Sequence, residues 1–145
     1  MAIFTSFDIS GSAMSAQRLR SDIISQNLAN VNSTSSQDGG AYRRKTVVFA
    51  EKNATAFSDI LLSTAGTVGS GVKVTSIVED YESVMNMVYD PAHPDADENG
   101  YVTYPNVNVV TEMTNLIDAS RSYEANVTAF NASKSMALKG LEIGK

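Results

Sequence analysis

Six residues, DADENG at positions 95–100, have the types and the spacing that open a calcium-binding loop. Asp95, Asp97 and Asn99 fall at the first, third and fifth ligand positions, and a glycine follows where such a loop turns sharply. The last ligand should be a glutamate that binds through both oxygens, but Asn106 stands there. Prolines also replace the entering helix. We therefore expect a solvated acidic turn, with no metal and no other cofactor.

The remaining polar residues do not form a convincing catalytic site. His93 is the only histidine and cysteine is absent, so a zinc site is improbable. Composition allows a Ser-His-Asp arrangement, yet no serine lies in a Gly-x-Ser-x-Gly elbow. GSG at residues 69–71 is too short for a dinucleotide fingerprint, and the longer AGTVGSG lacks the P-loop lysine. We expect no enzymatic activity.

Composition limits the partners that the chain can bind. The chain has 145 residues, enough for one ordinary domain, and 43% of them are hydrophobic, which allows a core. Its net charge of −5 makes nucleic acid a poor ligand, because affinity for phosphates comes from basic groups. One basic cluster, YRRK at residues 42–45, stands apart. It is typical of a solvated edge, but it could also pair with the carboxylates of a neighbouring acidic chain.

The N-terminal segment predicts an amphipathic helix from Thr5 to about Asn30. Thr5 and Asp8 resemble a capping box, which would start the helix at Thr5. Apolar residues at spacings of four and three form two weak seams, which suggests contacts with more than one neighbour. The main seam contains Ile3, Phe7, Met14, Ile24, Leu28 and Val31. Gly11, inside the helix, indicates either local flexibility or the close approach of another backbone.

The C-terminal segment has the strongest pattern in the chain. After Pro105, either Asn106 or Asn108 can cap a helix of about 35 residues, roughly 50 Å long at 1.5 Å per residue. A spacing of four and three picks out Val109, Met113, Leu116, Ser120, Tyr123, Val127, Phe130, Lys134, Ala137 and Leu141. A repeat of this length favours a coiled coil with partners outside the domain.

The sequence between the helices changes to short β-branched runs and turns. STAGTVGSG at 63–71 is typical of a loop. Strands are predicted for TVVFAE at 46–51, VKVTSIVE at 72–79, SVMNMVY at 83–89 and YVTYP at 101–105. The expected fold class is α+β, with long N- and C-terminal helices forming a coiled-coil core domain and a β-rich middle domain inserted between them. We place the boundaries at 1–32, 33–104 and 105–145.

Targeting signals are not evident in the sequence. The N-terminus lacks the basic region and unbroken apolar run of a signal peptide, and no stretch approaches the ~20 apolar residues of a membrane span. We expect no direct membrane insertion. If the chain leaves the cytoplasm, we expect export without a cleaved signal peptide.

Several segments together resemble the bacterial flagellar axial proteins, and among these the proteins of the proximal rod. They are NLANVNS at 27–33, YRRKTVVF at 42–49, YDPAHPDADENGYVTYPNVNVV at 89–110 and SRSYEANVTAFNASKSMALKGLEIG at 120–144. The resemblance spans nearly the whole chain, and its most specific part is the C-terminal segment. Residues 33–40 and 53–71 are loops in which no functional residue can be matched.

The resemblance implies a structural subunit of the flagellar basal body. Such a subunit assembles helically with copies of itself and with other rod and basal-body proteins, and it transmits torque through the periplasm. It also implies export through the flagellar type III apparatus. The terminal helices would form an inner coiled-coil tube with the β-rich segment outside. Asn27, Asn30 and Asn32 would close the first helix, because asparagine tolerates left-handed backbone.

The same resemblance implies an assembly interface on both helices and at the basic cluster. Its expected residues are Phe7, Met14, Ile24, Leu28, Arg43, Arg44, Lys45, Met113, Leu116, Tyr123, Val127, Phe130 and Leu141. Two alternatives remain at this point. One is a soluble coiled-coil adaptor that forms closed oligomers, and the other is a calcium-dependent binding module that uses residues 95–100.

Overall fold

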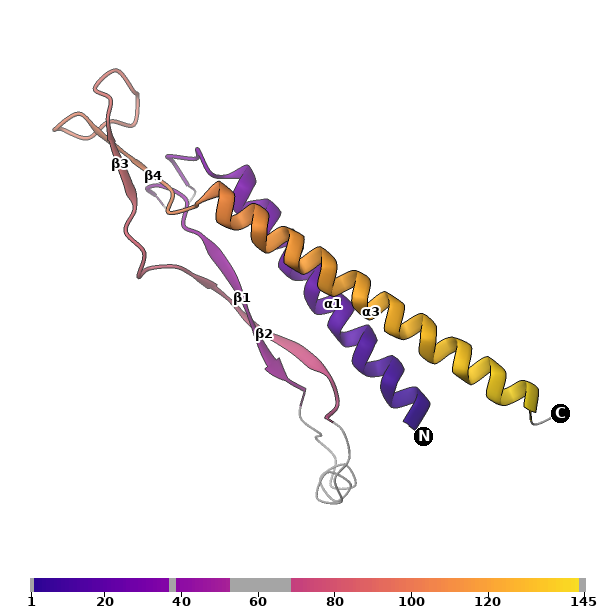
Figure 1. Cartoon of the computed structure of the whole chain (residues 1–145). Coiled ribbons are helices and arrows are strands. Elements are labelled where there is room, and N and C mark those ends of the chain that lie inside the picture. Colours follow the sequence, from indigo (N-terminus) through magenta and orange to yellow (C-terminus); the bar gives the residue numbers. More distant parts are fainter. Residues whose placement is uncertain (1, 37–38, 53–68, 144–145) are drawn as a thin grey trace.

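Two long helices form the body of the protein, and strands extend from one side of the pair. The computed structural model describes residues 2–36, 39–52 and 69–143. In Figure 1 the helices lie side by side, one pair of strands runs along them, and a second pair reaches beyond one end. The predicted α+β class, with long terminal helices and a β-rich segment between them, is confirmed.

The two helices begin in different ways. α1 spans Ala2–Ala29 and α3 spans Val109–Ile143, which gives α3 35 residues, the length expected from its pattern. Asn108 caps α3, because its Oδ1 accepts a hydrogen bond of 3.1 Å from the Thr111 backbone N–H. α1 begins before Thr5, so the prediction that Thr5 starts and caps this helix is wrong.

The C-terminal end of α1 is closed by local hydrogen bonds. The backbone N–H and the side-chain Nδ2 of Asn30 both donate to the Gln26 carbonyl, at 3.1 and 2.9 Å. Within the described part of the chain only glycines have positive φ, so the left-handed conformation expected at Asn27, Asn30 and Asn32 does not occur. Asn27 instead lies inside α1 and is fully buried.

The strands form two separate antiparallel pairs. β1 (Lys45–Glu51) pairs with β2 (Val72–Glu79), and β3 (Asn86–Tyr89) pairs with β4 (Tyr101–Tyr104). We refer to β1–β4 as the arm. All four predicted strands are present, and β2 has the predicted bounds. The predicted loop at residues 63–71 lies outside the described residues except for its last three.

β3 begins three residues later than predicted because the chain turns at Asp80. The Asp80 carboxylate accepts hydrogen bonds from the backbone N–H groups of Glu82 and Ser83 and from the Ser83 hydroxyl, at 2.7 to 3.1 Å. An aspartate that binds the backbone two residues later forms a local turn. These bonds, with that from the Ser83 backbone first, hold the pKa of Asp80 below its ordinary value.

The arm has little core of its own, and its β1–β2 pair lies along α1 (Figure 1). Val102 is the only buried large apolar residue among those described in β1–β4. Gly71, just before β2, has a φ of +104°, and a Cβ there would collide with Ser12 Oγ on α1. Gly11 has open space around it, so the close approach of two backbones occurs at Gly71. The domain boundaries stay a prediction.

Candidate assembly interface

α3 packs against α1 through a stripe of mostly small and polar residues. This inner stripe repeats every seven residues at Glu112, Ala119, Asn126 and Ser133, and again at Leu116, Tyr123, Phe130 and Ala137, of which only Tyr123 is exposed. The first row is buried or half-buried throughout. On α1 the buried residues are Ser10, Ala16, Ile23, Ile24 and Asn27. The Phe7 and Phe130 rings meet with their centroids 4.9 Å apart, a favourable tilted contact.

Of the two rows in the inner stripe, only the one that begins at Leu116 belongs to the predicted seam of α3. Its Leu116, Phe130 and Ala137 are half-buried. Its other row, Met113, Ser120, Val127, Lys134 and Leu141, is exposed apart from the half-buried Val127. The sequence pattern favours the more apolar row, whereas the structure places the row of smaller residues against α1. Small residues let two helices approach closely, and the larger apolar side chains are left outside.

The start of α3 therefore has an exposed apolar surface. We refer to Val109, Val110, Met113 and Ile117 as the outer stripe; Met113 is 54% exposed and Ile117 is 52% exposed. Their spacings of three and four residues place them along one side of the helix. Further exposed apolar residues toward the helix end are Tyr123, Met136, Leu138, Leu141 and Ile143. An exposed apolar surface of this kind is a candidate contact surface for another protein.

The sequence-predicted interface residues differ in their exposure. Met113, Tyr123 and Leu141 are exposed in this chain. The half-buried or buried members on the helices are Phe7, Met14, Ile24, Leu28, Leu116, Val127 and Phe130. Contact of either group with neighbouring subunits stays a prediction.

A buried network of hydrogen bonds connects α1, α3 and the segment that leads into β1. Asn27 Nδ2 donates to Glu112 Oε2 at 3.0 Å and to the Lys45 carbonyl at 2.8 Å. Asn27 Oδ1 accepts from the Tyr42 hydroxyl and from the Lys45 backbone N–H, both at 2.9 Å. The buried amide thus uses both of its N–H donors and both lone pairs. We refer to these four residues and Arg44 as the joint.

Arg44 supplies the charge that allows Glu112 to be buried. Its Nε and Nη2 lie 2.8 and 2.7 Å from Glu112 Oε1. The Glu112 side chain is only 1% exposed and that of Arg44 is 24% exposed. A carboxylate is tolerated in such a place only when it is paired and hydrogen-bonded. Burial, followed by the negative charges of Glu79 and Glu112, raises the pKa of Tyr42 above its ordinary value.

Asn106 connects the joint to the arm. Its Oδ1 accepts the Arg44 backbone N–H at 2.9 Å, and its Nδ2 donates to the carbonyls of Asp80 and Ser83 at 3.0 and 3.4 Å. Of the two asparagines that could cap α3, Asn108 performs that role. Asn106 instead connects the segment just before β1 to the turn between β2 and β3.

The basic side chains at residues 43–45 all have partners within this chain. The Arg43 guanidinium carbon lies 4.5 Å from the centre of the Tyr81 ring, and Lys45 Nζ lies 3.4 Å from Glu79 Oε1. The hydrogen bond from the Tyr81 hydroxyl, followed by Lys45, lowers the pKa of Glu79. A contact of this cluster with a neighbouring subunit stays a prediction.

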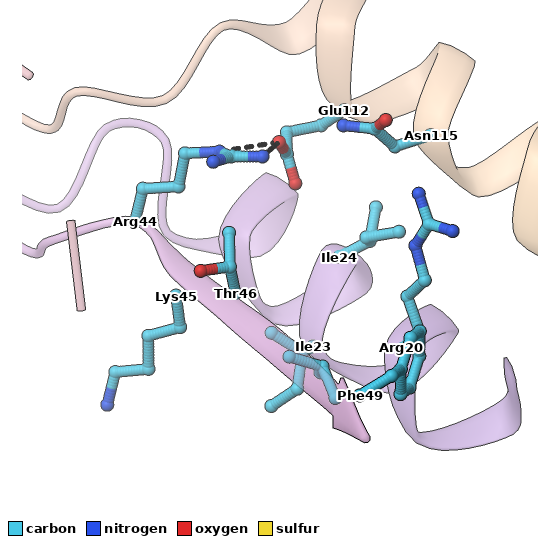
Figure 2. A pocket seen from close by; sticks show the side chains of 10 residues that line it. Arg20, Ile23, Ile24, Arg44, Lys45, Thr46, Phe49, Glu112 and Asn115 are labelled. Atoms are coloured by element: carbon cyan, nitrogen blue, oxygen red, sulfur yellow. Dashed lines mark hydrogen bonds and ion pairs between the residues drawn. The ribbon is translucent and has the colours of Figure 1, made fainter. Parts of the chain in front are cut away.

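A pocket of about 240 Å³ opens beside the joint, where α1, β1 and α3 meet (Figure 2). It is lined by Arg20, Ile23, Ile24, Arg44, Lys45, Thr46, Val47, Phe49, Glu112 and Asn115. In Figure 2 Arg44 points to Glu112, and Arg20 extends from near Phe49 toward Asn115. The pocket combines apolar side chains with three basic ones, those of Arg20, Arg44 and Lys45.

The acidic turn that resembles a calcium loop is bonded within the chain. Asp97 Oδ1 accepts from the Asn99 backbone N–H at 2.9 Å, and Asp95 Oδ2 accepts from the Thr34 hydroxyl at 2.7 Å. His93 Nδ1 accepts from the Asp95 backbone N–H at 3.1 Å. Over residues 2–36, 39–52 and 69–143, no three His, Cys, Asp or Glu side chains gather where they could hold a metal ion. Among the described helices, none is long and apolar enough to cross a membrane.

The sequence patterns do not identify the joint. Asn27 is predicted to end a helix, and Glu112 belongs to no predicted seam. The available signal is the seven-residue spacing from Glu112 to Ala119 and on to Asn126 and Ser133. That row contains polar residues that a search for apolar periodicity passes over.

Comparison with known proteins matches both ends of the chain to families of flagellar rod proteins. Residues 7–35 match the family model described as flagella basal body rod protein. Residues 98–143 match the model described as flagellar basal body rod FlgEFG protein C-terminal. Over the whole length of both chains, the sequence is 49% identical to the flagellar basal-body rod protein FlgC of Bacillus subtilis and 45% identical to that of Salmonella typhimurium. It is 44% identical to FlgC of Borreliella burgdorferi, covering 99% of this chain and 98% of that protein.

Proposed function

This chain belongs to the FlgC family of flagellar basal-body rod proteins and is a structural subunit of the rod, and we propose that it builds the proximal rod by helical assembly. Its neighbours would be copies of itself and other rod proteins of the basal body. The assembled subunits would transmit torque through the periplasm. We further propose that the chain reaches the rod through the flagellar type III export apparatus and has no catalytic role.

The outer stripe is the observation that supports assembly through α3. Met113 and Ile117 are more than half exposed although they lie on a helix whose other side is packed. Burying apolar surface is favourable by about 25 cal/mol per Å². Contacts that repeat from one subunit to the next without closing a ring generate a rod. A neighbouring subunit that covers this stripe would supply such a contact.

A charge placed on the outer stripe tests this function. Met113→Asp should leave the isolated fold within about 0.5 kcal/mol of the parent, because exposed substitutions rarely do more. In the assembled rod the same aspartate would be buried without a partner, which carries a large penalty. We therefore expect cells that depend on this variant to lose flagella and motility.

Ala125→Asp provides the matched control. Ala125 is exposed on α3, and its spacing places it away from the outer stripe. That variant should melt normally and complement a strain that lacks the gene. Full motility with Met113→Asp would show that the outer stripe does not carry assembly. Absence of the parent chain from isolated basal bodies would contradict the rod assignment itself.

A further inference from the structure

We propose that the pocket beside the joint receives the outer side of α3 from a second copy of this chain, with Arg20 paired to that copy's Glu124. The inference rests on the proposed helical assembly and adds to it the residues of one contact. Three separate observations support it: the pocket, Arg20 at its side with no partner among the described residues, and the exposed Glu124 on α3.

Arg20 is the cation of the pocket whose charge is not satisfied within the chain. Arg44 is bonded to Glu112, and Lys45 lies near Glu79. Among the described residues, no hydrogen bond or ion pair ends on Arg20. Its side chain is nevertheless half-buried along the pocket (Figure 2). A half-buried guanidinium binds a carboxylate more strongly than a fully solvated one does.

The shape of the pocket requires an apolar group next to that carboxylate. Ile23 and Ile24 are buried at its floor, and Val47 and Phe49 of β1 form another wall. A volume of about 240 Å³ is many times the ~10–15 Å³ that a single water needs. It therefore has room for a large apolar side chain. A charge alone would leave the apolar walls in water.

Glu124 is the carboxylate of this chain that best meets both requirements. Met113, Ile117 and Glu124 are spaced by four and seven residues, so they lie on the same side of α3. All three are exposed, and no described group binds the Glu124 carboxylate, although the Thr128 hydroxyl donates to the Glu124 backbone carbonyl at 2.9 Å. Asp118 is also exposed, but its position in the helical repeat turns it away from this side.

Most acidic groups of the arm and its turns are unavailable for this contact. Glu79 accepts the Tyr81 hydroxyl, and Asp80 accepts several bonds in its turn. Asp95 accepts the Thr34 hydroxyl, and Asp97 accepts the Asn99 backbone N–H in its own turn. The chain has 16 acidic and 11 basic residues, so a free arginine in a pocket has carboxylates of neighbouring copies as natural partners.

Such a contact would be heterologous, because the pocket of one copy meets α3 of the next. The pocket and the outer side of α3 are different surfaces of the same molecule, so a second copy leaves its own pocket free for a third. Contacts of this kind propagate along a filament.

Charge reversal with a matched control tests the pairing in cells that lack the chromosomal gene. Arg20→Glu should reduce the amount of this protein in isolated basal bodies by at least about tenfold, equivalent to about 1.4 kcal/mol. Arg18→Glu, two residues earlier, exposed to solvent and outside the pocket, should incorporate normally. Combining Arg20→Glu with Glu124→Arg should restore incorporation, whereas combining it with Asp118→Arg should not.

A photo-crosslinking amino acid at Thr46 identifies the occupant directly. We expect crosslinks in purified basal bodies to map to residues 113–124 of a second copy. Crosslinks to another rod protein alone, equal effects of the two arginine variants, or failure of the Glu124 rescue would overturn the inference. If the parent chain is present in basal bodies, each of these results leaves the rod function standing. Normal melting of the Arg20→Glu variant confirms that folding is not the cause.

Discussion

The joint makes a quantitative prediction about the coupling between Arg44 and Glu112. Glu112→Ala removes a carboxylate that accepts two bonds from Arg44 and one from Asn27. Hydrogen bonds to charged groups contribute about 1.5–3 kcal/mol, and breaking a fully buried ion pair costs about 3–5 kcal/mol. Arg44 is 24% exposed and can regain some hydration. We therefore expect the free energy of unfolding to fall by about 2–4 kcal/mol.

A double-mutant cycle separates the pair from its surroundings. Arg44→Ala, Glu112→Ala and the double variant are unfolded in urea and followed by far-UV circular dichroism. The double variant should be less destabilised than the sum of the single variants, with a coupling of about 1.5–3 kcal/mol. The reason is that removing both partners leaves no buried charge unpaired.

The chain contains its own reference pair. Lys139 and Glu142 are 2.9 Å apart, but their side chains are 77% and 66% exposed. An exposed pair at this spacing should give a coupling within about 0.5 kcal/mol of zero. If Arg44 and Glu112 couple no more strongly than this pair, then the burial of Glu112 does not make the joint a stabilising element.

Two further predictions concern the joint and the helix ends. The pKa of Tyr42 is raised above 10.0 in the folded chain, so its contribution to stability is complete below about pH 10 and is lost as the pH rises through the folded value. Tyr42→Phe should therefore flatten the fall in unfolding free energy above about pH 10, and identical profiles would contradict the burial of this phenol. In the isolated monomer, amides after Ser133 on α3 should exchange before those near Ala119, because Met136, Leu138, Leu141 and Ile143 are exposed and ordering costs about 1–2 kcal/mol per residue. Hydrogen-exchange mass spectrometry measures the order in which these amides exchange. Equal protection along the whole helix in a proven monomer would refute the prediction.

Local features that depend on neighbouring residues are predictable from the sequence. Pro105 and Asn108 predict the start of α3, and the hydrogen bond from the Thr111 N–H to the Asn108 side chain confirms this prediction. β2 has its predicted bounds because alternation and flanking turn residues act within a few positions. β3 is too long in the prediction because the Asp80 turn competes with strand formation at residues 83–85.

Which side of α3 faces α1 depends on more than periodicity. Two rows of α3 residues with the same seven-residue spacing could pack against α1. Hydrophobicity favours the more apolar row, which contains Met113 and Leu141. The structure buries the row with Ala119 and Ser133, because small side chains allow the two helices to come close. The larger side chains, such as Met113 and Leu141, stay exposed in the isolated chain.

The sequence by itself determined the element types, their order and the family, because periodicity, caps and matching segments are properties of the chain read in order. Only the tertiary structure decided that Asn27, Arg44 and Glu112 form one buried joint. Glu112 is separated from Asn27 by 85 positions and from Arg44 by 68. A glutamate is ordinarily a surface residue, and it becomes a buried one only when folding brings a guanidinium and an amide to it. The contact between these side chains depends on how the long intervening segment folds back, and no local sequence pattern predicts that.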